Sequence, residues 1–309
     1  MHIPVLSKEV LEYLNPKPGF RFIDCTAGGG GHIKAVLTAN PDSNILGIDL
    51  DQTTLDKLKK EFADSGLDQK VKLIAGNYAD LKKLSKSCGF ESADAILLDL
   101  GFSSLQIDDA ERGFTFQVRG PLDMRFNQSQ KTTAAEIINT YPETKLENII
   151  KEYGEESFAK KIAKQFVLKR KISSFAYTDQ VVDVIRDALP KPVKHKANDV
   201  SRRVFQALRI EVNRELENIR TVLPQALEML SPKGRLVVIS FHSLEDRIVK
   251  NFFVEQAKGC ICPPDFPTCI CNKASAVRIL TRKPITSSEQ EIAANPRSKP
   301  AKLRAAEKI

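Results

Sequence analysis

A run of four glycines at positions 28–31 constrains this chain more than any other feature. It follows an apolar segment that includes Phe22 and Ile23, and it leads into an amphipathic one. That order predicts a strand, a tight turn and the N-terminus of a helix. Glycines let a backbone approach a ligand closely because they carry no Cβ, and a helix start presents free N–H groups and a positive dipole end. We therefore expect a nucleotide-like cofactor at this turn.

The surrounding residues favour S-adenosylmethionine over NAD or ATP. The NAD fingerprint needs a small residue where this chain has Ile33, and no Gly-Lys-Ser/Thr sequence follows the glycines as a phosphate-binding loop requires. Asp49 ends a second predicted strand about twenty residues on, where it suits a ribose diol. Tyr78 follows the third strand and could lie against an adenine, and Asp99 ends the fourth. The alternative is that these are ordinary strand ends of a doubly wound sheet.

Strand and helix patterns alternate from position 20 to 101, which predicts a parallel α/β sheet. The strand pattern then stops for over a hundred residues, and the segment 201–230 reads as one long helix. Strand patterns return at 234–241, 276–282 and 302–306. The simplest organisation is a sheet domain formed by 1–108 and 203–309, with an all-helical domain for substrate recognition inserted at 109–202.

Composition indicates a globular protein with an anionic partner. The 309 residues carry a formal net charge of +8 and a sequence pI near 9.1, which favours nucleic acid. No apolar run approaches the roughly 20 residues that span a bilayer, so no membrane partner is expected. The start of the chain shows no signal or transit peptide, so a cytoplasmic location is the default expectation.

Four of the six cysteines form a C-x-C-x6-C-x-C pattern: Cys260, Cys262, Cys269 and Cys271. In a cytosolic protein such cysteines do not indicate a disulfide framework. Two C-x-C pairs could hold one tetrahedral zinc ion. However, the spacing is tighter than the usual C-x2-C, and the intervening Pro-rich segment can be rigid by itself. The pattern favours a reduced structural loop, and no metal is expected.

The segment from Asp99 to Phe102 has the outline of the acid–Pro–Pro–aromatic loop of amino-methyltransferases, with Leu-Gly in place of Pro-Pro. A conjugated base amine is a poor nucleophile, and Asp99 could accept its protons while Phe102 stacks on the ring. Positioning then supplies most of the rate, without a covalent enzyme intermediate. Carbon methylation of a pyrimidine needs a cysteine nucleophile, and none lies in this loop. The equal alternative is that Asp99 binds only the cofactor.

The chain as a whole resembles the bacterial 16S rRNA (cytosine-N4)-methyltransferase family RsmH, also called MraW. The resemblance covers essentially the full length and is specific because the matching runs are long and ordered. These runs are His2-x-Pro4-Val5-Leu6, Asp24-x-Thr26-x-Gly28-x-Gly30-Gly31-His32, Leu97-Leu98-Asp99-Leu100-Gly101-x-Ser103-Ser104-x-Gln106, Glu111-Arg112-Gly113-Phe114-x-Phe116, Gly120-Pro121-Leu122-Asp123-Met124-Arg125, Phe205-Gln206-Ala207-Leu208-Arg209-Ile210, Ser240-Phe241-His242-Ser243-Leu244-Glu245-Asp246-Arg247, the Cys-Pro-Pro loop and Asn295-Pro296-Arg297-Ser298.

This resemblance implies a class I, Rossmann-like, S-adenosylmethionine-dependent methyltransferase sheet with an inserted all-helical domain. It implies methylation of the exocyclic N4 amine of a decoding-centre cytidine, with 16S rRNA of the small ribosomal subunit as partner. It adds nothing in favour of a metal at the cysteine loop. The cofactor-binding positions that carry over are Gly30, Gly31, His32, Asp49, Tyr78, Asp99 and Gln106.

Three further residues are candidates with an alternative each. His242 follows the fifth strand and could relay the proton lost on methyl transfer, or it could be a hydrogen-bonded structural histidine. Arg112 and Arg125 could contact RNA phosphate or hold the inserted domain in place, with RNA slightly favoured for Arg125.

Other functions are also compatible with parts of the sequence. An NAD-dependent oxidoreductase is disfavoured by the broken glycine fingerprint. A DNA amino-methyltransferase would act where the 2′-hydroxyl is missing, and DNA is not expected as a partner. A non-catalytic RNA-binding assembly factor would use the sheet as a scaffold. The sequence leaves a homodimer open.

Overall fold

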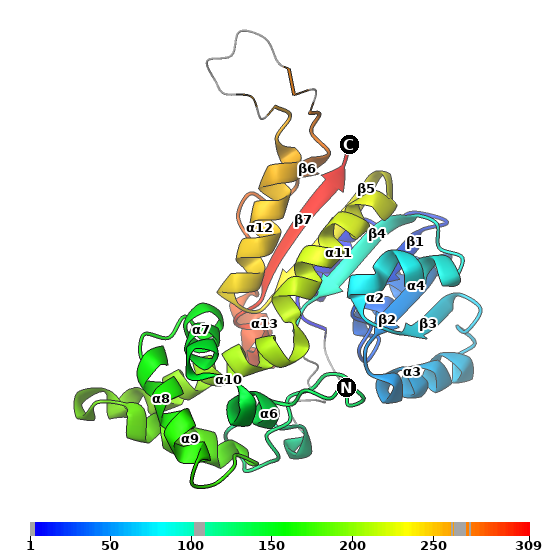
Figure 1. The fold of residues 1–309 in the computed structure, drawn as a ribbon. Coiled ribbons are helices and arrows are strands. Elements are labelled where there is room, and N and C mark those ends of the chain that lie inside the picture. The colour runs from blue at the N-terminus through cyan, green and yellow to red at the C-terminus, as the bar shows by residue number, and fades with distance from the viewer. Residues whose placement is uncertain (1–3, 102–108, 261, 263–269, 272) are drawn as a thin grey trace. The chain divides into compact units, whose positions relative to one another are not determined.

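The computed structural model describes residues 4–101, 109–260, 262, 270–271 and 273–309. The chain divides into two compact units (Figure 1). We call Met1–Gly101 with Leu216–Ile309 the sheet unit, and Phe102–Glu215 the helical unit. Each unit has its own core, so each is described by itself.

The sheet unit contains a seven-stranded sheet with the order β3-β2-β1-β4-β5-β7-β6. The pairs β1–β2, β1–β4, β2–β3 and β4–β5 are parallel, whereas β7 runs antiparallel to β5 and β6. The parallel α/β sheet expected from the alternating pattern is confirmed. The strands are β1 (Arg21–Asp24), β2 (Asn44–Asp49), β3 (Val71–Ala75), β4 (Ala93–Asp99), β5 (Leu230–Ser240), β6 (Val277–Ile279) and β7 (Lys302–Lys308).

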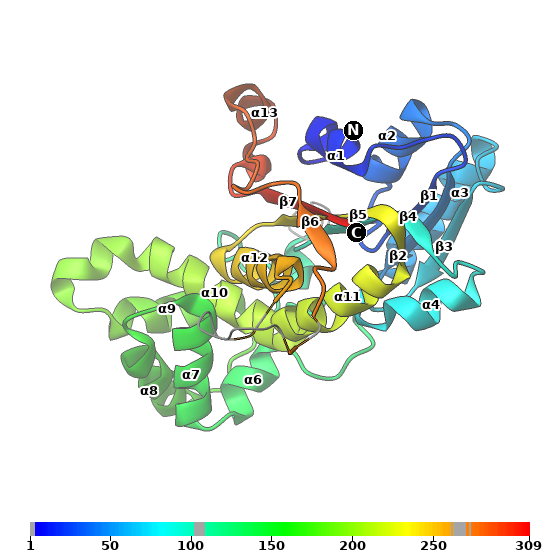
Figure 2. The same cartoon turned by 90° about the horizontal axis from the view of Figure 1, so that it is seen from above.

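Helices cover both faces of this sheet. Figure 2 shows α1 and α2 on one side, with α4, α11 and α12 on the other. The helices of the sheet unit are α1 (Ser7–Leu14), α2 (Gly31–Ala39), α3 (Gln52–Asp64), α4 (Leu81–Ser87), α11 (Glu215–Met229, its first residue in the helical unit), α12 (Ser243–Ala257) and α13 (Glu289–Ala294), with short 3-10 turns η1 (Tyr78–Asp80) and η4 (Pro296–Ser298).

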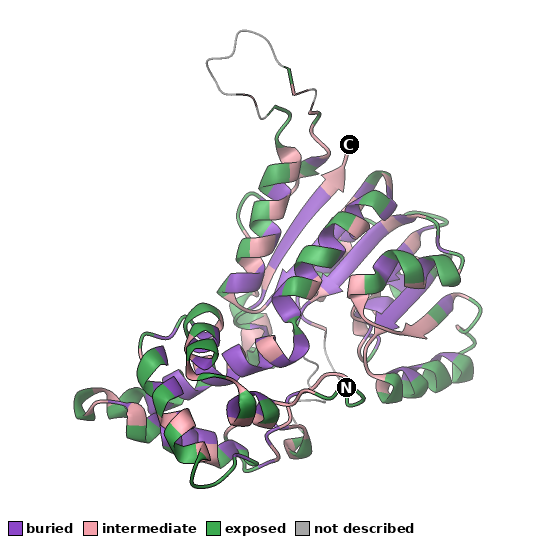
Figure 3. Cartoon of the chain, in the orientation of Figure 1, coloured by how far each residue is buried: buried purple, intermediate pink, exposed green. Residues whose placement is uncertain are grey.

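The central strands are buried on both faces, as parallel strands between helical layers must be. Leu97 of β4 joins a core formed with α1, α2 and α3, whereas its neighbours Ile96 and Leu98 point to the other face, and all three are fully buried. Figure 3 shows the strands as the buried centre of the unit. This packing fixes the strand ends, and with them the side chains that follow.

In the described part of the helical unit, residues 109–215, the regular elements are helices, with one isolated bridge between Pro121 and Tyr177. Its apolar residues form one continuous core, in which Phe166 and Phe175 meet edge to face at 5.4 Å. The inserted all-helical segment expected from the sequence is therefore present. Its described elements are η2 (Ala110–Arg112), α6 (Ala134–Thr140), α7 (Glu143–Gly154), α8 (Ala159–Arg170), α9 (Thr178–Ala188), η3 (Lys191–Lys196) and α10 (Ala197–Asn213).

The single helix expected over 201–230 is wrong. Helix α10 ends at Asn213, Arg214 adopts a left-handed φ of 51°, and α11 begins at Glu215. The side chain of Asn213 accepts a hydrogen bond from the Phe126 backbone and donates to the Met124 carbonyl, both at 2.8 Å. These contacts tie the end of α10 to a neighbouring segment and interrupt the helix.

The units also divide at positions other than the expected ones. The expected boundary at 202/203 falls inside α10, whose Val204, Phe205 and Leu208 belong to the helical core. The division lies instead at the break between the two helices, between Glu215 and Leu216, and the first division follows Gly101 rather than residue 108. Separately, none of the helices in the described ranges combines the length and apolar character that crossing a membrane requires.

Gly47 in β2 allows helix α2 to pack closely on the sheet, and its replacement by alanine should destabilise the sheet unit. A Cβ at Gly47 would lie 2.6 Å from Leu73 Cδ2 and 3.0 Å from Ile33 Cδ1, so both side chains would have to move. We expect Gly47→Ala to lower the free energy of unfolding by about 1–3 kcal/mol in urea denaturation. The control is Gly29→Ala, where a Cβ meets nothing within 4 Å. Equal effects of the two substitutions would contradict this account.

Candidate active site at the carboxyl ends of the strands

Three carboxylates lie at one edge of the sheet. Asp24, Asp49 and Asp99 are the last residues of β1, β2 and β4. Because β1 lies between β2 and β4 and all three strands are parallel, their carboxyl ends are neighbours. Ligands of open α/β sheets bind outside this edge.

Thr26 joins the ends of β1 and β4. Its backbone N–H donates to Asp24 Oδ1 at 3.0 Å, and its hydroxyl Oγ1 accepts the backbone N–H of Asp99 at 2.7 Å. The position of Asp99 is thus set by main-chain and side-chain hydrogen bonds from the neighbouring strand.

Asp49 joins β2 to the glycine turn. Its Oδ2 accepts the N–H of Gly28 at 2.8 Å, and its Oδ1 accepts the N–H of Asp51 at 2.9 Å. Burial raises the pKa of Asp49, and these backbone hydrogen bonds oppose that rise. Each carboxylate oxygen has a second lone pair, so Asp49 can still accept a hydrogen bond from a ligand hydroxyl.

The glycine turn has the backbone that its sequence predicts. Gly28 and Gly30 have φ values of 48° and 74°, and Gly31 opens α2. A Cβ at Gly30 would lie 2.5 Å from Leu58 Cδ1, so this turn packs against α3 only because the residue is glycine. Gly29 is exposed, and a Cβ there would meet nothing within 4 Å. The turn is therefore held firmly on one side and open on the other.

His32 lies in the first turn of α2 and is 5% exposed. Its Nε2 is 3.5 Å from Asp99 Oδ2, an ion-pair distance that is too long for a well-formed hydrogen bond. Burial opposes a charged imidazole, but the carboxylates of Asp99 and Asp24 outweigh it, and the pKa of His32 is raised. The neighbouring carboxylates thus favour the charged form of His32 more than burial disfavours it.

Asp24 is buried, and it lies close enough to His32 and Asp99 to interact electrostatically with both. Burial raises its pKa to about 6, although His32 and the Thr26 hydrogen bonds pull in the opposite direction. Among the described residues, Asp24 Oδ2 and Asp99 Oδ1 have no hydrogen-bond partner. Buried polar atoms without partners are rare in proteins and call for a ligand or water.

Of the remaining predicted cofactor-binding residues, Tyr78 lies within the described part of the chain and Gln106 does not. Tyr78 follows β3 and is half-buried, and the N–H of Gly76 donates to the Asp49 carbonyl at 2.9 Å, which keeps this segment beside β2. Phe102 and Gln106 lie outside the described residues, so their predicted roles in stacking and cofactor binding stay predictions.

His242 lies after β5, at the same edge, because Ile239 of β5 pairs with Asp99. Its Nε2 is 3.2 Å from Glu245 Oε1, and its side chain is 8% exposed. Glu245 also caps α12, since its Oε2 accepts the N–H of Phe241 at 2.8 Å. These contacts place His242 beside the buried Glu245, and both interpretations of its role, as a proton relay or as a structural histidine, stay predictions.

The two arginine candidates both bind backbone within the helical unit. Arg125 makes a two-point ion pair with Asp123, at 2.7 Å for each hydrogen bond, and donates to the carbonyl oxygens of Gln128 and Gln130. Arg112 donates to the carbonyls of Arg125 and Phe126 at 2.9 and 3.1 Å. The donors of Arg125 are engaged internally, which supports a structural role rather than the RNA contact.

Sequence reasoning did not name Asp24 and Thr26 as site residues. The available signal was an acid at a strand end, directly before the glycine run, of the same kind as Asp49 and Asp99. What the sequence did not show is that Thr26 bonds the Asp99 backbone across 73 positions.

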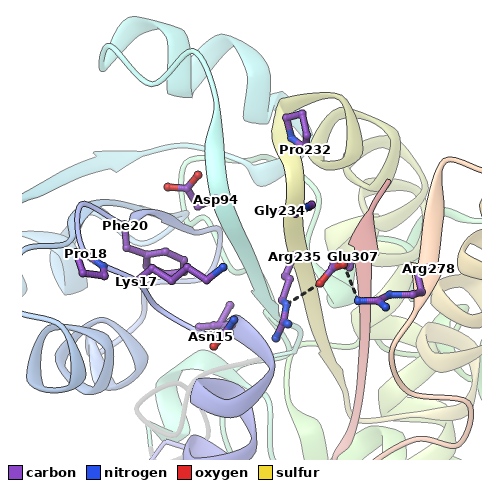
Figure 4. Close-up of a pocket in the computed structure, with 12 residues that line it drawn as sticks. Asn15, Lys17, Pro18, Phe20, Asp94, Pro232, Gly234, Arg235, Arg278 and Glu307 are labelled. Carbon is purple, nitrogen blue, oxygen red and sulfur yellow. Dashed lines mark hydrogen bonds and ion pairs between the residues drawn. The ribbon is translucent and has the colours of Figure 1, made fainter.

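A basin of about 700 Å³ lies at the opposite, amino-terminal edge of the sheet (Figure 4). Its lining includes Asp94, at the start of β4, and Arg235 near the start of the parallel part of β5. Glu307 pairs with both Arg235 and Arg278, at 3.3 and 2.8 Å. Arg235 and Arg278 share the single carboxylate of Glu307, and none of the predicted site residues is among the described residues that line the basin.

Comparison with known proteins identifies the family. The model of the MraW methylase family matches residues 1–309. The chain belongs to this family. Proteins named ribosomal RNA small subunit methyltransferase H are 50% identical in Heliobacterium mobile, 44% in Carboxydothermus hydrogenoformans and 43% in Clostridioides difficile, each over 100% of this chain and 98–99% of the relative. The structure of a putative rRNA methylase from Clostridium thermocellum aligns with a TM-score of 0.46 at 13% identity, over 100% of both chains.

This MraW methylase is therefore a methyltransferase, and its cofactor is S-adenosylmethionine. The site fits that cofactor. The buried acceptor Asp24 Oδ2 suits a positively charged amino group or sulfonium. Asp49 suits ribose hydroxyls, and the open side of the glycine turn allows close approach.

Replacing Asp24 by asparagine should remove a pH-dependent cost to stability. The pKa of Asp24 rises from 3.8 to about 6 on folding. The folded state therefore binds this proton more tightly, and the contribution of the carboxyl group to stability is lost as pH rises from about 4 to 6. Asparagine keeps an oxygen for Thr26 and does not ionise. At each pH, the free energy of unfolding of Asp24→Asn is compared with that of wild type. The difference in favour of the variant should increase by on the order of 2 kcal/mol between pH 4 and pH 8.

Urea denaturation at several pH values measures this difference. The control is Asp64→Asn, at an exposed position near the end of α3, where the same substitution removes a carboxyl group that is not buried. A gain for Asp24→Asn that is the same at pH 4 and pH 8 would show that the Asp24 carboxyl is not buried as described.

Proposed function

We propose that this MraW methylase transfers a methyl group from S-adenosylmethionine to the exocyclic N4 amine of a decoding-centre cytidine in 16S rRNA. The observation that carries the proposal is the full-length similarity, at 43–50% identity, to proteins named for methylation of small-subunit ribosomal RNA. The net charge of +8 supports a polyanionic substrate. The proposed substrate is the RNA within the small ribosomal subunit, which places the enzyme in the bacterial cytoplasm.

The amine target is supported by the chemistry of Asp99. When bound, S-adenosylmethionine supplies an electrophilic methyl group on a positively charged sulfur. Asp99 Oδ1 is a buried acceptor without a partner among the described residues, and Oδ2 is held beside His32. We assign Oδ1 to accept a hydrogen bond from the substrate amine, orient its nitrogen, and take the proton that the amine loses after transfer. Fixed positioning of this kind accounts for most of the rate in a direct displacement.

The cysteine beside this cluster argues against carbon methylation. That reaction needs a thiolate nucleophile. Cys25 is 1% exposed, and burial together with the neighbouring Asp24 raises its pKa well above the usual value. Its thiol therefore stays protonated and cannot serve as the nucleophile at neutral pH.

The product of the reaction tests the proposal directly. The enzyme is incubated with labelled S-adenosylmethionine and small subunits from cells that lack this modification, and the digested rRNA is analysed by mass spectrometry. We expect label in N4-methylcytidine at one position. Label in 5-methylcytidine, or transfer to DNA in preference to RNA, would contradict the proposal.

The role of Asp99 can be separated from cofactor binding. Asp99→Asn keeps the size of the side chain but removes its charge and its capacity to take a proton, so kcat should fall by about 10²-fold or more with the cofactor saturating. The control is Asp94→Asn at the amino end of the same strand, where asparagine can still accept the Arg21 N–H, and it should retain wild-type kcat. If saturating cofactor restores the rate of Asp99→Asn, then Asp99 only binds the cofactor.

A further inference from the structure

Three cysteines converge in the segment between α12 and β6. Cys260 and Cys262 follow α12, and Cys271 precedes β6. Their sulfur atoms all lie within 4.8 Å of one another, and the Cys260 and Cys271 sulfurs are 3.7 Å apart. The backbone N–H of Cys262 points to Cys260 Sγ at 3.4 Å. The sequence alone could not show that Cys271 comes beside Cys260 and Cys262.

Hydrogen bonds next to the cysteines hold the two ends of this segment together. The N–H of Ala276 donates to the Gln256 carbonyl at 2.9 Å, and Lys273 Nζ donates to the Glu255 carbonyl at 3.1 Å. The N–H of Ile309 donates to the Ala276 carbonyl at 3.0 Å, which anchors the base to the last residue of the chain. The sulfur cluster thus lies on an ordered base within the sheet unit.

The sulfur separations match a metal site better than a disulfide. A disulfide brings two sulfurs to about 2.05 Å, and these three cysteines are not in disulfide bonds. In tetrahedral zinc thiolate sites the Zn–S distance is about 2.3 Å, which places neighbouring sulfurs about 3.8 Å apart. The Cys260–Cys271 separation of 3.7 Å is close to this value, and the third sulfur needs to move by at most about 1 Å to reach it.

We propose that Cys260, Cys262 and Cys271 bind a zinc ion that clamps the two ends of the segment between α12 and β6. Zinc accepts thiolate ligands in tetrahedral geometry, and the cysteines lie at the opposite end of α12 from the methyltransferase site, so we assign the ion a structural role. Cys269 lies outside the described residues, and the proposal depends on the other three.

This site is separate from the methyltransferase site. Helix α12 begins next to His242, at the carboxyl edge of the sheet, and its 15 residues span about 22 Å before the cysteines begin. The zinc ion would therefore stabilise the fold at the far end of α12 without contacting the cofactor or the substrate amine.

Metal content tests the proposal on the full-length protein. The chain is produced without a polyhistidine tag in medium with added zinc, dialysed under reducing conditions and analysed by plasma mass spectrometry. We expect about one zinc per chain, lost in Cys260→Ser and Cys271→Ser. The control is Cys88→Ser, at a half-buried cysteine that ends α4, which should keep its zinc.

A second readout does not depend on variants that fold poorly. Wild-type protein stripped of metal by a chelator is titrated with Co²⁺, which should give thiolate charge-transfer absorption and the visible bands of a tetrahedral ion, both removed by one equivalent of Zn²⁺. The proposal is overturned if fully reduced wild-type protein carries no zinc and gives no such bands. It is also overturned if Cys88→Ser loses zinc to the same extent as Cys260→Ser.

Discussion

The candidate site depends on the hydrogen bonds of Thr26. This side chain and its backbone link the Asp24 carboxylate at the end of β1 to the Asp99 backbone at the end of β4. Asp49 makes the corresponding link from β2 to the glycine turn. Because these bonds join neighbouring parallel strands, the edge of the sheet is a fixed frame rather than a set of independent loops. Ligand-binding groups on such a frame need little reorganisation when a substrate arrives.

The charge states of the buried side chains at this edge depend on these fixed positions. Asp24 and Asp99 lie close enough to His32 for their carboxylates to raise the pKa of its imidazole despite burial, while burial raises the pKa of Asp24 to about 6. The cluster therefore changes its charge close to neutral pH. A positively charged cofactor would interact favourably with the carboxylates of this cluster.

Much of this organisation could be predicted from the sequence because it depends on residues that are close together in the chain. The glycine run, the strand-ending acids and the alternation of strands and helices each depend on neighbouring residues, and the sheet and the helical insertion agree with them. The break between α10 and α11 could not be predicted, because it depends on contacts of Asn213 with residues about 90 positions away. The bond from the Asp99 backbone to Thr26 spans 73 positions and was unpredictable for the same reason, and the approach of Cys260 to Cys271 also depends on the folded segment.

The most direct test of the central claim is a crystal structure of this MraW methylase in complex with S-adenosylmethionine. The account predicts the cofactor at the carboxyl edge of the sheet. Its ribose hydroxyls would bind Asp49, the main chain of the glycine turn would contact it, and its charged groups would lie near Asp24 and Asp99. Cofactor density in the basin beside Asp94 and Arg235, at the opposite edge, would contradict the account.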